Sequence, residues 1–202
     1  MTTTAWDRID TARERWDVLR HPFYARWSAG ELTPDELAAY SGQYRRAVEA
    51  IAEMSEAIAA AFPEREDLAE HARAEREHVA VWDRFVEATG GERDAQATPE
   101  TAACVEAWTA EGHPLATLAR LYAIESSQPA ISRTKLKGLT GHYGFDEGPA
   151  TEYFSVHEDL DAQHAREGRE LIAELAGSGR DDELVAAAAA AYRANWRLLD
   201  GI

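Results

Sequence analysis

The sequence predicts an all-α protein that folds as a bundle of about seven helices. Apolar residues recur at spacings of three and four, and no segment shows the strict alternation of a half-buried strand. Thr33-Pro34-Asp35-Glu36 has the form of a capping box with proline at the first helical position, and Gly90-Gly91 is typical of a helix end. A chain of 202 residues is long enough for a sizeable core and short enough for one domain, so residues 1–202 are expected to form a single helical domain.

The elements follow from the apolar periodicity and from the start and stop signals. The helix expected to begin at His113 carries Pro129 in its interior, and that proline is expected to kink the helix or to open its hydrogen-bond ladder because it lacks an N–H. Asp181 and Asp182 favour the start of the last helix. In chain order, the expected helices cover residues 7–19, 34–62, 66–88, 99 onward, 113 to 138 or 141, 147–175 and 181–199, with a short helical turn at 21–27.

Composition limits the classes of partner. Lysine and arginine number 21 and aspartate and glutamate 37, which gives a net charge of −16. Such a surface disfavours nucleic acid and anionic membranes, both of which require clustered basic residues. No apolar run reaches membrane-spanning length, and the first residues lack the apolar core of a signal peptide. A single cysteine, Cys104, suits a reducing compartment, so a cytoplasmic protein is expected.

The most informative motif is a set of three polar residues on the helix expected at 147–175. His157, Asp161 and His164 occupy positions i, i+4 and i+7, which places their side chains within about 60° of arc on one helix face. That face continues the apolar positions Tyr153 and Phe154, so it is expected to face the core. Two imidazoles and a carboxylate are costly there unless a partner satisfies them, and a transition metal does so directly.

Two other helices carry similar polar residues on their core-facing stripes. His71, Glu75 and His78 lie between Leu68 and Trp82 at spacings of three and four, and Glu125 is the one carboxylate on the stripe of the helix that starts at His113. A satisfied polar network is the alternative for these residues. However, inward-facing Glu and Glu-x-x-His residues are the recurring way to hold two metal ions in a bundle. Imidazole and carboxylate donors suit iron or manganese, and the lack of thiolates disfavours structural zinc.

These residues and several flanking motifs resemble the haem-oxygenase-like diiron oxidases. Within that superfamily, the chain is most similar to the self-sacrificing para-aminobenzoate synthases related to the chlamydial death-domain-associating protein. The resemblance extends over most of the chain and implies a haem-oxygenase-like helical bundle. The matching segments are His21-Pro-Phe-Tyr24, Tyr40-Ser-Gly-Gln-Tyr44, Tyr122-Ala-Ile-Glu125-Ser-Ser-Gln-Pro129, Lys135-Leu-Lys-Gly138-Leu, His142-Tyr-Gly144 and Tyr153 through His157 to His164.

The resemblance implies a specific set of ligands. The metal-binding glutamate of the family corresponds to Glu125, the late triad to His157, Asp161 and His164, and the earlier histidine to His78. The last ligand is normally a glutamate seven residues before that histidine, and this position is His71 here. We expect only one of His71 and Glu75 to bind metal, with His71 favoured by its position.

The same resemblance implies a function. The sacrificed tyrosine of the family corresponds to Tyr24, a second active-site tyrosine to Tyr40 and the lysine implicated as amino donor to Lys135. The expected enzyme is a non-haem oxygenase with two iron ions, or an iron and a manganese ion, that uses dioxygen and an external reductant to make para-aminobenzoate from its own tyrosine. A homodimer is the expected assembly. From the sequence alone, ordinary core packing explains the two tyrosines equally well.

Three other functions remain open from the sequence. The first is an oxygenase of the same fold that acts on an external amino acid, fatty acid or biosynthetic intermediate. The second is a metal-free enzyme that resembles thiaminase II or pyrroloquinoline-quinone synthase. A thiaminase-like reaction requires a nucleophilic cysteine near the pocket, and Cys104 lies on a different helix from the expected one. The third is a pure interaction protein, which would leave the ligand set unexplained.

Overall fold

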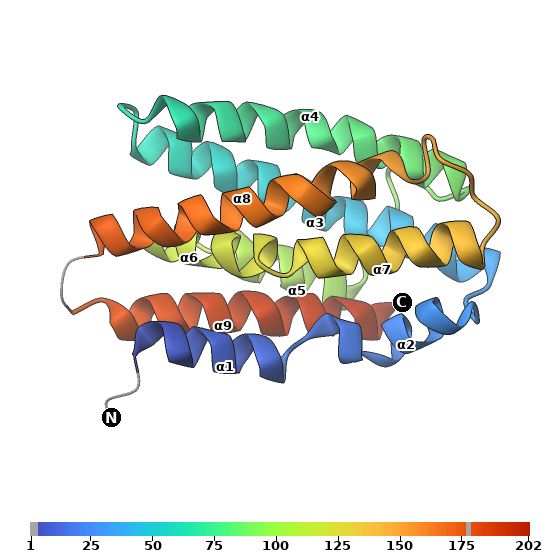
Figure 1. The fold of residues 1–202 in the computed structure, drawn as a ribbon, viewed down its shortest axis with the longest axis horizontal. Coiled ribbons are helices and arrows are strands. Elements are labelled where there is room, and N and C mark those ends of the chain that lie inside the picture. The colour runs from blue at the N-terminus through green and yellow to red at the C-terminus, as the bar shows by residue number, and fades with distance from the viewer. Residues whose placement is uncertain (1–3, 177–178) are drawn as a thin grey trace.

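The protein is a bundle of nine α-helices in the computed structural model, which describes residues 4–176 and 179–202 (Figure 1). A short 3-10 turn, η1, lies between α1 and α2, and a second one, η2, follows α9. No strand occurs within the described ranges. This confirms the all-α prediction. The elements are α1 (Ala5–Arg15), η1 (Val18–Arg20), α2 (Pro22–Ala29), α3 (Pro34–Ala61), α4 (Glu66–Ala88), α5 (Pro99–Trp108), α6 (Pro114–Glu125), α7 (Gln128–Gly141), α8 (Glu152–Leu175), α9 (Asp181–Leu198) and η2 (Leu199–Gly201).

The long helices lie roughly parallel to one axis of the molecule (Figure 1). Helix α4 packs mainly on α3 at one side, and α9 packs on α1, α5 and α6 at the other. Helix α8 crosses between them and contacts α7 and α6 more extensively than α4. The interior between α4, α6 and α8 is therefore enclosed by segments that are far apart in the sequence.

Several predicted helix ends are confirmed, and their caps explain them. Thr33 accepts a hydrogen bond from the backbone N–H of Glu36, while the Glu36 side chain accepts one from the Thr33 backbone, which completes the capping box at the start of α3. Helix α4 spans the predicted residues and is followed by Gly90, whose φ of 73° suits glycine. Residues 181–198 form the last helix, as expected.

The long helix predicted to start at His113 is divided in two. The prediction of one helix is therefore wrong, while the predicted opening of its hydrogen-bond ladder at Pro129 is confirmed. Pro129 has no N–H to donate to the carbonyl of Glu125, four residues earlier, so the hydrogen-bond ladder stops there. Helix α6 ends at Glu125, and α7 begins with Pro129 in its first turn. This division, together with α2 at the predicted turn, raises the count from about seven helices to nine in the described chain.

Helix α8 also begins later than predicted, at Glu152 rather than residue 147. Gly148 has a φ of 152°, which no helical residue adopts, and its backbone N–H donates to the hydroxyl of Thr151. The segment before Glu152 is therefore a turn. The apolar positions that follow, including Tyr153 and Phe154, are buried as predicted.

The core is rich in aromatic side chains. Trp27, Trp82 and Trp108 are fully buried, and the Trp82 indole donates a hydrogen bond to the carbonyl of Ser41 at 2.8 Å. A buried indole N–H with a partner fixes the orientation of the ring.

In the described part of the chain, no helix combines the length and apolar content that a membrane crossing demands.

Candidate metal centre

Helix α4 directs three donor residues toward the interior. His71, Glu75 and His78 follow one another at spacings of four and three, so they share one face of the helix. Glu75 and His78 are buried, and the side chain of His71 is 14% exposed. The predicted core-facing stripe of α4 is confirmed at these positions.

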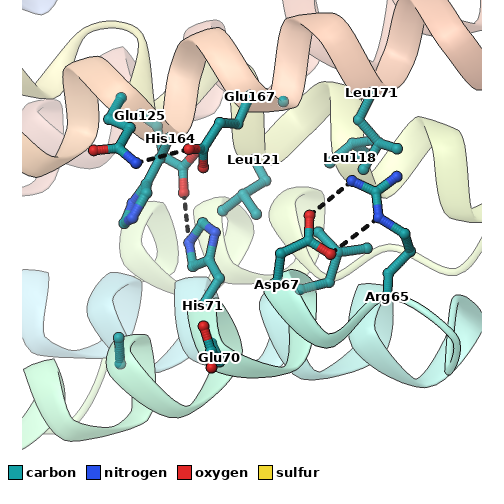
Figure 2. Close-up of a pocket in the computed structure, with 14 residues that line it drawn as sticks. Arg65, Asp67, Glu70, His71, Leu118, Leu121, Glu125, His164, Glu167 and Leu171 are labelled. Atoms are coloured by element: carbon teal, nitrogen blue, oxygen red, sulfur yellow. Dashed lines mark hydrogen bonds and ion pairs between the residues drawn. The ribbon is translucent and has the colours of Figure 1, made fainter.

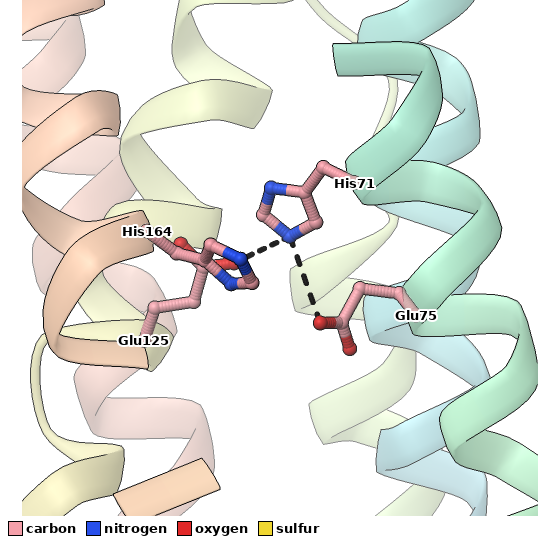
Figure 3. A group of neighbouring side chains, drawn as sticks. All are labelled: His71, Glu75, Glu125 and His164. Carbon is pink, nitrogen blue, oxygen red and sulfur yellow. Dashed lines mark ion pairs between the residues drawn. The ribbon is translucent and has the colours of Figure 1, made fainter. Parts of the chain in front are cut away.

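Helices α8 and α6 supply the remaining predicted residues. His157 and Asp161 are buried on the inner face of α8, and the side chain of His164, one turn further, is 14% exposed. Glu125 is the last residue of α6 and is also buried. Three helices thus bring all seven predicted ligands to one region, and Figure 3 shows how His71, Glu75, Glu125 and His164 approach one another.

The distances between donor atoms are short. The Nε2 atom of His71 lies 2.9 Å from Oε1 of Glu125 and 3.6 Å from Oε1 of Glu75. That same Glu75 oxygen lies 3.3 Å from Nδ1 of His78. The donor atoms fall into two groups, each with all atoms within 4.8 Å of one another: His71, Glu75, Glu125 and His164 form one, and Glu75, His78 and His157 form the other.

Asp161 belongs to neither group at that distance. Its Oδ1 atom lies 3.9 Å from Nδ1 of His164. Its Oδ2 atom is buried and has no hydrogen-bond partner among the described residues. Asp161 therefore borders the cluster, and its Oδ2 atom is available to bind a metal ion.

Several of the buried donor atoms lie within ion-pair distance of one another, but they make no hydrogen bond within the described chain. Burying such atoms without partners costs free energy, and seven of them in one place would be very unfavourable unless cations bind. The orphaned atoms are Nε2 of His71 and His157, Nδ1 of His78 and His164, Oε1 of Glu75 and Glu125, and Oδ2 of Asp161. This donor set fits iron or manganese ions.

His157 is oriented by the backbone of its own helix. Its Nδ1 atom lies 2.6 Å from the carbonyl oxygen of Tyr153. Since a carbonyl can only accept, Nδ1 carries the proton and Nε2 keeps the lone pair that faces the cluster. Fixing the tautomer of a metal-binding histidine through its other nitrogen is a usual feature of such sites.

The electrostatics of the cluster favour an added positive charge. Burial raises the pKa of Glu125 and of Asp161, and burial lowers the pKa of His157 to about 4. Burial alone disfavours the protonated imidazole of His71, but Glu125 and Glu75 outweigh it and raise its pKa to about 10. Buried carboxylates that draw a proton onto a neighbouring imidazole would interact equally with a divalent cation.

A cavity of about 320 Å³ leads to one side of the cluster. Its wall includes His71, Glu125 and His164, while Arg65 lies at the opposite side of the cavity (Figure 2). Its apolar wall is formed by Leu68, Ala74, Leu118, Leu121 and Leu171. This volume lies at the lower end of the range for small-molecule sites, roughly 300–1,000 Å³.

Tyr24, Tyr40 and Lys135 lie together in a second buried cluster. The Phe23 ring contacts both tyrosines, with centroids 5.5 Å from Tyr24 and 4.9 Å from Tyr40. The Nζ atom of Lys135 lies 5.0 Å from the centre of the Tyr40 ring. All three predicted residues are at most 2% exposed, so the solvated helix face that is normal for lysine does not apply to Lys135.

An aromatic cage surrounds the lysine amine, and the sequence did not indicate it. Besides Tyr40, three rings face Nζ at 4.7–5.3 Å: Tyr44, Trp82 and Phe154. No carboxylate of the described residues lies within ion-pair distance of Lys135, and burial lowers its pKa well below the usual value. The i, i+4 spacing of Tyr40 and Tyr44 on α3 predicts that these two rings share a helix face. Trp82 on α4 and Phe154 on α8 are far away in the sequence and complete the cage only in the folded protein.

The candidate metal-binding cluster and the lysine cage are adjacent. The Tyr153 ring stacks on His157 with centroids 3.8 Å apart, and the Trp82 ring lies 4.8 Å from Tyr153. Trp82 in turn borders Lys135. Two aromatic side chains, Tyr153 and Trp82, therefore connect the candidate ligand His157 to the buried amine.

Cys104 takes no part in either donor group. It is buried on α5, and burial raises the pKa of its thiol. A thiol with a raised pKa is a poor nucleophile. This disfavours the thiaminase-like reaction that required a reactive cysteine.

Two known proteins are similar to this chain over most of its length. The chain is 31% identical to the 4-aminobenzoate synthase of Chlamydia trachomatis, in a match that covers 89% of this chain and 84% of that protein. It is 30% identical to the 4-aminobenzoate synthase of Nitrosomonas europaea, with 100% and 92% covered.

Solved structures share the fold. A TenA homologue from Pseudomonas syringae superposes with a TM-score of 0.83 at 20% identity, over 98% of this chain and 90% of that one. A protein with a haem-oxygenase-like fold from Shewanella denitrificans gives 0.79 at 21% identity, over 95% and 88%. The family model of iron-containing redox enzymes matches residues 40–196, which include α4 to α8 in full, most of α3 and α9, and all seven candidate ligands. The chain therefore belongs to the haem-oxygenase-like family of iron-containing redox enzymes and is an oxidoreductase.

Proposed function

We propose that the protein makes 4-aminobenzoate from one of its own tyrosines, with dioxygen and an external reductant, at a centre of two iron ions or one iron and one manganese ion. The relatives named 4-aminobenzoate synthase support the product. The observation that carries the proposal is the burial of Tyr24, Tyr40 and Lys135 in one aromatic cluster beside the metal-binding residues.

The chemistry of the product fits a tyrosine as its source. Tyrosine and 4-aminobenzoate both carry a benzene ring with two para substituents. The conversion replaces the phenolic oxygen by nitrogen, and it oxidises the Cβ carbon to a carboxylate with cleavage from Cα. Tyr24 supplies the ring in this scheme, and the nearby amine of Lys135 supplies the nitrogen.

The environment of Lys135 suits an amino donor. An amine must be neutral to present its lone pair, and burial lowers the pKa of Lys135 so that this form is favoured. The surrounding rings, among them Tyr40 and Tyr44, enclose Nζ and bury it away from solvent. Burial raises the pKa of Tyr24 and Tyr40, so both phenols keep their protons until they are oxidised.

The seven candidate ligands would hold the metal ions: His71, Glu75, His78, Glu125, His157, Asp161 and His164. When bound, the metal ions supply the electrons and open coordination positions with which dioxygen is activated. His157 is held for this role by its hydrogen bond to the Tyr153 carbonyl. The cavity beside His71 and His164 gives small molecules access to the centre.

The test is product formation by the protein alone. Metal-loaded protein with reductant and dioxygen is expected to release at most one 4-aminobenzoate per chain, and mass spectrometry is expected to show a chain altered at Tyr24. Tyr24→Phe and Lys135→Ala should each stop product formation while the protein still binds metal. Lys137→Ala is the matched control because Lys137 is exposed on the same helix. Equal product from Tyr24→Phe would show that Tyr24 is not the source.

One observation favours a second function, an oxygenase that acts on an external small molecule. The 320 Å³ cavity reaches His71, Glu125 and His164 and is lined by leucines, as a binding site for a partly apolar substrate would be. If no product forms unless a small molecule is added, and Tyr24 remains intact, this second function replaces the first.

A further inference from the structure

The two donor groups have one residue in common. Glu75 is a member of both, and its Oε1 atom lies 3.6 Å from Nε2 of His71 on one side and 3.3 Å from Nδ1 of His78 on the other. We call His71, Glu125 and His164 the outer group, and His78 and His157 the inner group. The carboxylate of Glu75 stands between them.

We propose that Glu75 is a ligand common to two metal ions, and that His71 is an additional ligand that belongs to the outer ion alone. This inference rests on the metal centre of the proposed function, but it concerns which residue holds which ion. It replaces the expectation that only one of His71 and Glu75 binds metal.

The local geometry supports both residues as ligands. His71 and Glu75 are four residues apart on α4, so they lie one above the other on the same face. Nε2 of His71 and Oε1 of Glu75 are both buried without a hydrogen-bond partner in the described chain, although they are only 3.6 Å apart. If only one of them bound metal, the other would keep an unsatisfied buried atom.

The position of His71 assigns it to the outer ion. Its Nε2 atom lies 2.9 Å from Glu125, which is in the outer group, and its ring stacks on that of His164 at a centroid distance of 4.1 Å. His78 and His157 instead face each other, with ring centroids 4.4 Å apart. The donor set of each ion therefore contains two histidines, and Glu75 links the two sets.

The two positions also differ in their access to solvent. His71, Glu125 and His164 line the 320 Å³ cavity, whereas His78 and His157 do not. The His157 residue is buried, and the side chain of His78 is 10% exposed, against 14% for the side chains of both His71 and His164. A chelator in the cavity would meet the outer ion first, so the outer ion should exchange faster than the inner one.

The experiment counts bound ions rather than activity. Protein and variants are loaded anaerobically with Fe(II) or Mn(II), desalted, and analysed for metal per chain. The parent and Glu77→Ala, an exposed control on the same helix, are expected to keep two ions. His71→Ala should keep one ion per chain. Glu75→Ala should bind both ions more weakly than the parent does. Circular dichroism establishes that each variant is folded.

Each other outcome is decisive. Two tightly bound ions in His71→Ala would show that His71 is not a ligand, and loss of both ions would show that it does not serve the outer ion alone. One tightly bound ion in Glu75→Ala would show that Glu75 is not shared. If the parent itself binds no metal, the proposed function fails, and this result is distinct from those above.

A second measurement uses the parent and does not depend on the folding of a variant. Anomalous scattering from crystals soaked in Mn(II) should show two peaks on either side of the Glu75 carboxylate, with His71 beside the outer one. In solution, a chelator should remove one ion quickly and the other slowly. A single peak, or two peaks of which neither contacts His71, would overturn the proposal.

Discussion

The rings of Tyr153 and His157 are stacked, with centroids 3.8 Å apart and planes inclined by 18°. The same two residues are also joined by the hydrogen bond from Nδ1 of His157 to the carbonyl oxygen of Tyr153. The backbone of Tyr153 fixes the tautomer of His157, and its side chain fixes the plane of the ring. The Tyr153 hydroxyl has no hydrogen-bond partner among the described residues, so the ring rather than the hydroxyl performs this function.

This relationship predicts different effects for two substitutions of Tyr153. Tyr153→Phe keeps the stacked ring and should leave metal affinity unchanged. Tyr153→Ala removes the ring and should weaken metal binding about 10- to 100-fold, the usual effect of losing a residue that orients a ligand. Titration with Mn(II) measures both. A loss of affinity in Tyr153→Phe equal to that in Tyr153→Ala would assign the effect to the hydroxyl.

Loss of a ligand is expected to stop the consumption of dioxygen. Glu125→Ala and His157→Ala each remove a buried donor atom from a different group of the cluster. Neither variant should consume dioxygen after loading with Fe(II), because the remaining donors cannot hold both ions. An oxygen electrode makes the measurement, with Glu77→Ala as the control. Full uptake by either variant would exclude that residue as a ligand.

Lys135 makes stability depend on pH. Burying the charged form of an unpaired amine costs several kcal/mol, about as much as burying any single ion. The surrounding rings offset only part of that cost, because a cation–π contact contributes about 2 kcal/mol. Lys135→Met should therefore raise the free energy of unfolding at neutral pH by about 1–3 kcal/mol. The exposed Lys137→Met should change it little.

The sign of the pH dependence follows from proton binding. The pKa of Lys135 is lowered in the folded state, so between that pKa and the ordinary lysine value the unfolded chain binds more protons. The parent then gains stability as pH rises, and the advantage of Lys135→Met shrinks toward the ordinary pKa of lysine. Urea denaturation at a series of pH values measures it. An advantage that grows with pH would mean that the amine is charged in the folded protein.

Gly138 is predicted to be sensitive to a single methyl group. A Cβ at this position of α7 would stand 2.6 Å from Cδ1 of Trp27 and closer still to its Nε1, so α2 and α7 would have to move apart. Gly138→Ala should destabilise the protein by about 1–3 kcal/mol. Gly141→Ala is the matched control on the same helix, because a Cβ there meets nothing within 4 Å. Thermal unfolding compares the two, and equal melting temperatures would contradict the prediction.

The sequence was sufficient for most of the helices and for the inward-facing positions of the candidate ligands, because both depend on spacing along one helix. The i, i+4, i+7 pattern of His157, Asp161 and His164 defines a face of α8 whatever that face contacts, and the structure buries that face as predicted. The caps at Thr33 and Thr98 are local interactions of the same kind. The break at Pro129 is local too, but whether a proline kinks a helix or ends it depends on the surrounding packing.

Features that involve several helices were not accessible from the sequence. The sharing of Glu75 depends on how α4 approaches both Glu125 on α6 and His157 on α8. The burial of Lys135 likewise depends on rings from α3, α4 and α8. Neither arrangement leaves a periodic signal, because the residues involved are far apart along the chain.

The uneven packing of α4 gives the metal centre a mechanical role. Helix α4 rests mainly on α3, and its contact with α8 is limited, while three of the seven candidate ligands lie on α4 and three on α8. Bound ions would therefore link these two helices and stabilise their packing, much as disulfides stabilise small secreted proteins. A cell short of iron would then hold a looser and more protease-sensitive form of the enzyme, so that metal supply would govern how long each chain survives as well as whether it is active.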